Sequence, residues 1–353
     1  MPEIISDDIG SFPLPPDVKK EEIRSTASKI ATGVAGEEER EKFNKIVGEM
    51  MQKKIESGIM RPNYPQVQDM IASFAFLMEN HSEEDEPWLV KKNHAVIPEL
   101  SAISEAAKSY LKERGEPLQI RVCVTGPLEL YLKSVGGSVQ EDLLMNMAES
   151  VSRFVENSLL DTGYLKTSLL SIDEPSLGLN PNLVIDEDVL ADAWETAMQK
   201  AGKRDVEMHL HSVNAVDLVY AVEKINVIGV EYAANHRALD LLDKGEIESY
   251  DKFLRVGVAA TDIARMAAEY LERYGADLWK TKEYSLLAER MENVKNITKR
   301  LKKAYELFDE RMKYAGPDCG LGGWPSQDAA YQLLKNAAEA VSAFNSAKSN
   351  TPA

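Results

Sequence analysis

The sequence has few cysteines and no long apolar run. Only two of its 353 residues are cysteine, Cys123 and Cys319, and two thiols cannot form the disulfide framework of a small secreted fold. Apolar stretches such as residues 75–78 are far shorter than the ~18 residues that a membrane-spanning helix requires. These two absences argue against a disulfide framework and against a membrane-spanning helix.

Basic residues are scarce relative to acidic ones. The chain has 41 Lys and Arg residues against 58 Asp and Glu residues, which gives a net charge of −17. An acidic surface repels phosphate backbones and anionic lipids, so we expect no nucleic-acid partner and no membrane partner. The acidic residues 1–8 lack the basic-then-apolar pattern of an export signal, which predicts a cytoplasmic protein.

Apolar residues make up 44% of the chain, which is enough for a folded core. Because no Ser/Gly/Pro-rich linker divides the sequence, we expect a single domain over residues 1–345, followed by a flexible tail, 346–353. Short apolar runs bounded by turn residues recur, and they predict β-strands. The eight predicted strands are residues 4–9, 58–61, 118–124, 168–172, 206–210, 227–232, 253–259 and 312–315.

Amphipathic helical stretches, such as residues 139–160 and 186–200, lie between these runs. Alternating strands and helices indicate a parallel sheet, and eight strands favour closure into an α/β fold of the (β/α)₈ TIM-barrel type. An open doubly wound sheet is the alternative, but its Gly-rich dinucleotide turn is missing at residues 9–13. Two predicted helical segments are additional to those that a barrel needs. They are a hairpin insertion over residues 16–51 and one long helix over residues 283–312.

The predicted long helix carries a basic cluster in an otherwise acidic chain. Charge runs of this kind are usually a solvated helix face. The alternative is a docking face for an acidic partner protein. The basic cluster consists of Lys295, Lys299, Arg300, Lys302 and Lys303.

Barrel enzymes place reactive groups at the carboxyl ends of their strands, and polar residues stand there in this chain. His209 and His211 end the fifth predicted strand and point to one face of it, Glu231 ends the sixth with Tyr232, and Cys319 follows the eighth. Taken alone, each has an ordinary structural interpretation, such as a core thiol or a satisfied polar histidine. Together they offer nitrogen, oxygen and sulfur ligands, which predict a zinc ion able to activate a thiol.

Two other strand ends face the same mouth of the predicted barrel. Asp173 and Glu174 precede a proline after the fourth strand, and paired acids there either grip an ammonium group or cap a helix. Gly10 and Ser11 end the first strand region, where a missing side chain lets backbone amides approach a carboxylate.

In these motifs the chain resembles the cobalamin-independent methionine synthase family, specifically its zinc-bearing C-terminal catalytic barrel. The resembling segments span nearly the whole chain in order, and they are residues 9–13, 172–175, 209–212, 231 and 317–321. The resemblance implies a zinc-dependent methyltransferase in which Asp173 is the catalytic residue that holds the substrate amine. It implies that the segment containing Gly10 and Ser11 holds the substrate carboxylate.

The chain departs from that family's pattern in three respects. His211 stands where the family has a cysteine ligand, and Tyr64 and Gln66 stand where it has a glutamate for the substrate amine, which makes them the substrate-binding candidates here. Ala264 stands where folate-using members carry a histidine that protonates the leaving folate nitrogen. A corrinoid leaving group needs no such proton, and the chain resembles the short, single-barrel, corrinoid-dependent form.

We therefore expect methyl transfer from a methylcorrinoid, either methylcobalamin or a corrinoid protein partner, to a small thiol. Homocysteine is the favoured acceptor, which would give methionine. Other functions stay open: a coenzyme M-type thiol acceptor, a folate donor, or a non-catalytic barrel that binds a corrinoid protein. A hydrolase of the amidohydrolase kind also uses a His-x-His pair, and it would recruit Asp318 and His236.

Overall fold

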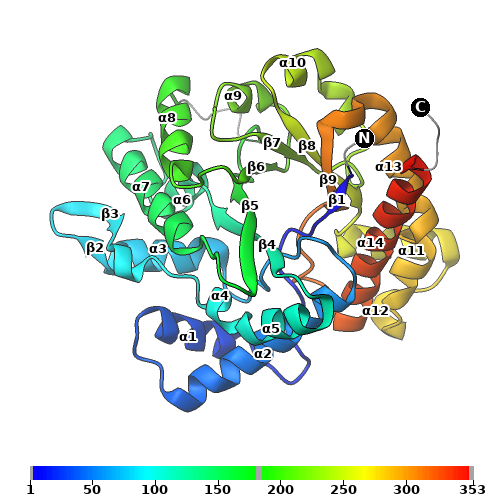
Figure 1. Cartoon of the computed structure of the whole chain (residues 1–353), viewed down its shortest axis with the longest axis horizontal. Helices are drawn as coiled ribbons and strands as arrows, with labels where there is room; N and C mark the ends of the chain where they lie inside the picture. Colours follow the sequence, from blue (N-terminus) through cyan, green and yellow to red (C-terminus); the bar gives the residue numbers. More distant parts are fainter. Residues whose placement is uncertain (1–2, 180–184, 350–353) are drawn as a thin grey trace.

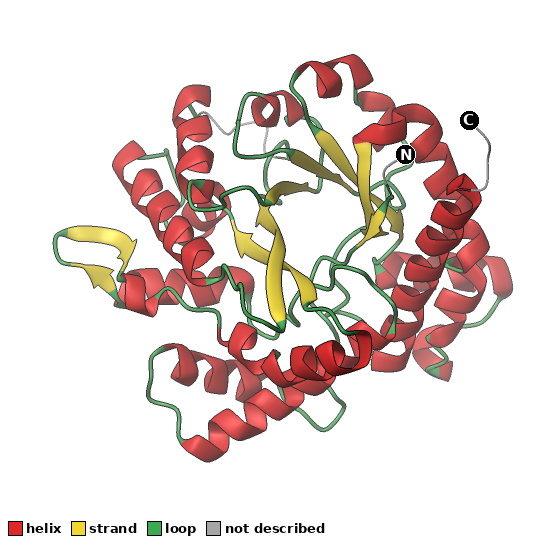
Figure 2. Cartoon of the chain, viewed as in Figure 1, coloured by secondary structure: helices red, strands yellow, loops and turns green. Residues whose placement is uncertain are grey.

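The computed structural model describes residues 3–179 and 185–349 of the chain. At its centre is a curled parallel sheet of seven strands in the order β1-β9-β8-β7-β6-β5-β4, with helices around it (Figures 1 and 2). Each strand overlaps one that the sequence predicts. The strands are β1 (Ile5–Ser6), β4 (Leu118–Thr125), β5 (Leu165–Asp173), β6 (Asp205–Leu210), β7 (Val227–Val230), β8 (Phe253–Ala259) and β9 (Met312–Pro317).

Several of the surrounding helices bury one apolar face. In α7, Leu144, Met147, Val151 and Phe154 are buried at three- and four-residue spacing, which is the pattern of an amphipathic helix packed on a sheet. A small antiparallel hairpin, β2 (Ser82–Glu83) and β3 (Glu86–Val90), lies outside the main sheet. The helices are α1 (Lys20–Ala31), α2 (Glu37–Glu56), α3 (Met70–Asn80), α4 (Pro98–Ala102), α5 (Ser104–Arg114), α6 (Pro127–Ser134), α7 (Glu141–Asn157), α8 (Glu187–Met198), α9 (Val216–Tyr220), α10 (Lys244–Ser249), α11 (Ile263–Tyr274), α12 (Leu278–Thr281), α13 (Val294–Phe308) and α14 (Gln327–Ser349).

The strand predicted over residues 58–61 does not form. Arg61 and Asn63 make only isolated bridges, one to the residue after β1 and one to β4. Pro62 between them has no backbone N–H to give to a ladder, and the N–H of Asn63 donates to Asp8 Oδ1 at 2.7 Å instead. The sheet is therefore a curled seven-stranded half-barrel and not the closed eight-stranded barrel that we predicted.

The long helix predicted over residues 283–312 is interrupted. A π-helical turn (Leu287–Met291) ends before α13 begins. The helix is interrupted there because the carboxylate of Glu292 turns inward and accepts a hydrogen bond from Arg300 Nη1 at 2.5 Å. In addition, the side chain of Asn293 caps α13 by accepting a hydrogen bond from a backbone N–H.

Both ends of the predicted domain contain helices in the described residues. The hairpin insertion predicted over residues 16–51 corresponds to α1 and α2, which pack against each other. At the other end α14 continues to Ser349, so residues 346–349 are helical and not part of a tail, while residues 350–353 lie outside the described residues. Within the described ranges, no helix has both the length and the apolar character to cross a membrane.

Candidate active site

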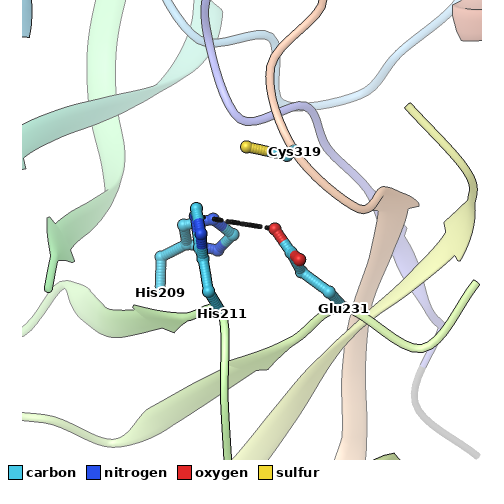
Figure 3. Close-up of side chains that lie close together, drawn as sticks. All are labelled: His209, His211, Glu231 and Cys319. Carbon is cyan, nitrogen blue, oxygen red and sulfur yellow. Dashed lines mark ion pairs between the residues drawn. The ribbon is translucent and has the colours of Figure 1, made fainter. Parts of the chain in front are cut away.

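The four predicted metal ligands lie together at the carboxyl ends of three strands (Figure 3). His209 is on β6 and His211 just after it, Glu231 follows β7, and Cys319 comes shortly after β9. One ligand atom from each residue lies within 4.8 Å of the other three. Glu231 Oε1 is 3.8 Å from His209 Nε2 and 3.6 Å from His211 Nε2. We call these four residues the ligand cluster.

The ligand cluster suits a metal ion by its chemistry. His209 is 1% exposed, and within the described part of the chain neither of its ring nitrogens has a hydrogen-bond partner. Burial, with His211 nearby, lowers the pKa of His209 well below its usual value, so the ring is in the neutral form that coordinates metals. A buried polar group without a partner is costly, and a metal ion would provide that partner. Two imidazoles, a carboxylate and a thiol are donors that zinc prefers.

A nearby cation would be needed to ionise the thiol of Cys319 near neutral pH. Burial raises the pKa of this thiol to about 12. Without a cation the thiol therefore stays protonated near neutral pH, and protonated thiols are poor ligands and poor nucleophiles.

Asp318 anchors the loop that carries Cys319. Its carboxylate accepts hydrogen bonds from the backbone N–H groups of Ala233 and Ala234 at 3.0 and 2.6 Å. A side chain at Gly257 would collide with Asp318 Oδ1, so this contact requires glycine there. Asp318 is occupied by backbone donors and stands outside the ligand cluster. This placement removes the main support for the hydrolase alternative.

Asp173 ends β5 beside the ligand cluster, where it pairs in register with His209 of β6. Its Oδ1 accepts from Ser171 Oγ at 2.8 Å and its Oδ2 accepts from Cys123 Sγ at 2.8 Å. Burial raises the pKa of Asp173, and Arg121 opposes that shift. A cationic group arriving from a substrate would stabilise the ionised form of this carboxylate further.

Glu174 points away from this site. Its carboxylate accepts from the backbone N–H groups of Leu128 and Glu129 at 3.0 and 2.6 Å, and from Trp194 Nε1 at 2.9 Å. These contacts place it at the amino end of α6, where the helix dipole favours a negative charge. Glu174 therefore connects the Asp173 segment to α6, and its oxygens are held by donors of the protein itself.

Glycine at position 126 makes room for Glu174, and this predicts a stability effect. We expect Gly126→Ala to lower the free energy of unfolding by about 1–3 kcal/mol, because the added Cβ would collide with Glu174 Oε1. Urea-induced unfolding measures the change. Gly163→Ala is the matched control, since a Cβ there meets no atom within 4 Å. An equal loss of stability in both variants would contradict this explanation.

The other predicted substrate-binding residues lie around Gly10. A Cβ at Gly10 would come within 2.5 Å of Gln66 Cδ, and its φ of 142° also favours glycine. Gln66 Nε2 is buried and has no hydrogen-bond partner among the described residues, whereas the Tyr64 hydroxyl donates to Cys123 O at 2.8 Å. Ser11 Oγ accepts from the N–H of Gly322 at 3.0 Å, which ties Ser11 to the loop of Cys319.

A layer of buried charges lies deeper in the sheet interior than the ligand cluster. The residues of this charged layer are all 0% exposed, and they are Asp7, Arg121, Glu207 and Arg255. Burial alone would lower the pKa of Arg121, but the carboxylates of Glu207 and Asp7 raise it above its usual value. Sequence reasoning missed this layer. The available signal was that Glu207, His209 and His211 alternate along one strand and so share a face.

The basic cluster lies entirely on α13. Its four lysines are exposed. Arg300 instead pairs with Glu292 and donates to Val258 O at 2.7 Å, so it does not belong to the exposed face. Within the basic cluster, the four lysines therefore form the exposed face that a partner could contact.

Comparison with known proteins relates the chain to others by structure and not by sequence. No protein-family model matches it, and no curated protein matches it in sequence. A B12-independent methionine synthase from Shewanella sp., solved in complex with selenomethionine, matches with a TM-score of 0.63 and 13% identity over 99% of this chain and 100% of that one. A Listeria monocytogenes protein assigned to the same activity matches with a TM-score of 0.58 and 13% identity over 98% of each chain. At these identities the likeness establishes a shared fold over the whole described architecture.

Proposed function

We propose that the protein is a zinc-dependent methyltransferase that methylates a small thiol, with homocysteine as the favoured acceptor and methionine as the product. The observation that carries the proposal is the ligand cluster with Asp173 on the adjacent strand, in register with His209. The fold shared with methionine synthase structures supports it. The occupied carboxylate of Asp318 favours thiol chemistry over a hydrolase.

Each part of the acceptor has residues suited to it. Zinc held by the ligand cluster would lower the pKa of the acceptor thiol and make it a nucleophile near neutral pH. The carboxylate of Asp173 would accept hydrogen bonds from the acceptor's ammonium group. The backbone at Gly10 and Ser11, together with the unpartnered Gln66 Nε2, would donate to its carboxylate. Fixing both ends of the acceptor orients its sulfur for an in-line displacement.

For the methyl donor we propose a methylcorrinoid, either free methylcobalamin or a corrinoid protein. Ala264 stands in the first turn of α11, the helix that follows β8, and its methyl side chain cannot protonate a leaving nitrogen. A folate leaving group needs that proton, whereas a corrinoid does not. For a protein-bound corrinoid, the exposed lysines of the basic cluster offer a face complementary to an acidic carrier.

Methyl transfer to homocysteine from two alternative donors tests the donor assignment. We expect the zinc-loaded, full-length protein to form methionine from methylcobalamin. With methyltetrahydrofolate we expect a rate at least about 100-fold lower, because a general acid contributes that much or more to such a step. Product formation is measured by mass spectrometry.

The same assay separates the remaining alternatives. Turnover with the folate alone would contradict the corrinoid assignment. Faster methylation of coenzyme M than of homocysteine would indicate that the acceptor is a thiol without an amine. Binding of a corrinoid without methylation of any thiol would indicate a non-catalytic barrel and contradict the proposed enzyme.

A further inference from the structure

The charged layer approaches the ligand cluster at one point. Glu207 and His209 are two residues apart on β6, so their side chains lie on the same face of the strand. Glu207 Oε1 is 4.0 Å from His209 Nδ1, and both side chains are almost fully buried. Among the described residues, this nitrogen has no hydrogen-bond partner. The structure thus places a buried carboxylate beside the ring nitrogen that faces away from Glu231.

Arg121 holds Glu207 in place. Its guanidinium donates to both carboxylate oxygens, at 2.5 and 3.1 Å, and also to Asp7 Oδ2 at 2.7 Å. A bidentate pair of this kind fixes the direction of the carboxylate as well as its charge. The neighbouring strand β7 leaves room for it, because a side chain at Gly229 would collide with Glu207 Oε1.

The same guanidinium also reaches the proposed substrate aspartate. Arg121 donates to Ser171 Oγ at 2.7 Å, and Ser171 Oγ donates to Asp173 Oδ1 at 2.8 Å. A continuous path of buried polar contacts therefore connects Asp173 with Glu207, which stands next to His209. One arginine orients a carboxylate on each side of the site.

We propose that Glu207 is a positioning residue, which accepts a hydrogen bond from His209 Nδ1 and so fixes the imidazole with Nε2 directed at the metal. The proposal rests on the metal site of the proposed function. A carboxylate in this position selects the tautomer of a metal-binding histidine and makes its other nitrogen a stronger donor. The separation in the structure exceeds a hydrogen bond by about 1 Å, and the proposed contact requires the ring of His209 to move closer to Glu207.

Zinc affinity tests this role without reference to catalysis. It is measured on the full-length protein by competition with a chromophoric chelator. We expect Glu207→Asp, which keeps a charge for Arg121 but withdraws the carboxylate from His209, to weaken zinc binding about 10- to 100-fold. Glu207→Gln is expected to weaken it similarly, but it also leaves Arg121 without its anionic partner. Circular dichroism checks folding, and Glu207→Asp decides the test where Glu207→Gln does not fold.

Glu292→Gln is the matched control. Glu292 is also a buried carboxylate with a bidentate arginine partner, Arg300, but it stands outside the ligand cluster. The zinc affinity of the Glu292→Gln protein should stay within about twofold of the wild-type value, as expected for an independent site. Wild-type affinity in Glu207→Asp would overturn the positioning role and leave the metal site intact. Absence of zinc binding by the wild-type protein would overturn the metal site and this role with it.

Discussion

Replacing Cys319 by alanine is expected to release the bound zinc and abolish methylation of the acceptor thiol. Cys319 supplies the only sulfur in the ligand cluster, and a thiolate is the ligand that most favours zinc over magnesium or calcium. Loss of an outer partner of a metal ligand already lowers affinity 10- to 100-fold, so loss of a direct ligand should cost about 100-fold or more. Zinc content after dialysis, measured by plasma mass spectrometry, checks this result.

Cys123→Ala is the matched control for that experiment. Cys123 is the second of the two cysteines in the chain, and its thiol donates to Asp173 Oδ2 without joining the ligand cluster. We expect Cys123→Ala to retain its zinc. A Cys319→Ala protein with the same zinc content as the wild type would contradict the ligand set.

Replacing Asp173 by asparagine should have the second largest effect. The substitution keeps the size of the side chain but removes the charge that we propose binds the acceptor's ammonium group. Losing one partner of a buried charge pair costs about 2–5 kcal/mol, which corresponds to a fall of about 30- to 5,000-fold in kcat/KM for homocysteine. Steady-state kinetics at a saturating donor concentration measures this change, and zinc content should stay at the wild-type level.

An acceptor without the amine separates this effect from general damage to the site. With 4-mercaptobutanoate, which is homocysteine lacking its amino group, the wild-type protein should react more slowly than with homocysteine. The Asp173→Asn protein should methylate the two acceptors at similar rates, because the contact that distinguishes them is gone. If the variant kept the wild-type preference for homocysteine, another residue would have to bind the amine.

The strands could be predicted from the sequence because a parallel sheet covered on both faces is built from continuous apolar runs. Residues 118–124 and 253–259 are apolar apart from Gln119, Arg121 and Arg255, and both segments form strands close to their predicted bounds. The prediction of a strand over residues 58–61 was wrong because Pro62 and a side-chain acceptor, Asp8, divert the backbone from the ladder. The prediction of one continuous helix over residues 283–312 was wrong for a similar reason. The inward contact of Glu292 is set by tertiary packing and not by helical periodicity.

Part of the candidate site could be predicted from the sequence because rare residue types stand at strand ends. Two of five histidines and one of two cysteines stood there, and the structure brings these side chains together with Glu231. The orientation of Glu174 could not be predicted, because it depends on where α6 begins relative to β5. The Arg121–Glu207 pair was equally hidden, since its members are 86 residues apart and meet only through the order of strands in the sheet.

X-ray absorption at the zinc edge, recorded with and without homocysteine, tests most directly whether this site binds zinc and presents it to a thiol. For the zinc-loaded protein we predict one sulfur neighbour, from Cys319, and a second sulfur neighbour when homocysteine is added. A sulfur count that does not change at saturating homocysteine would contradict activation of the acceptor by the metal, and a zinc site without any sulfur neighbour would contradict the ligand set itself.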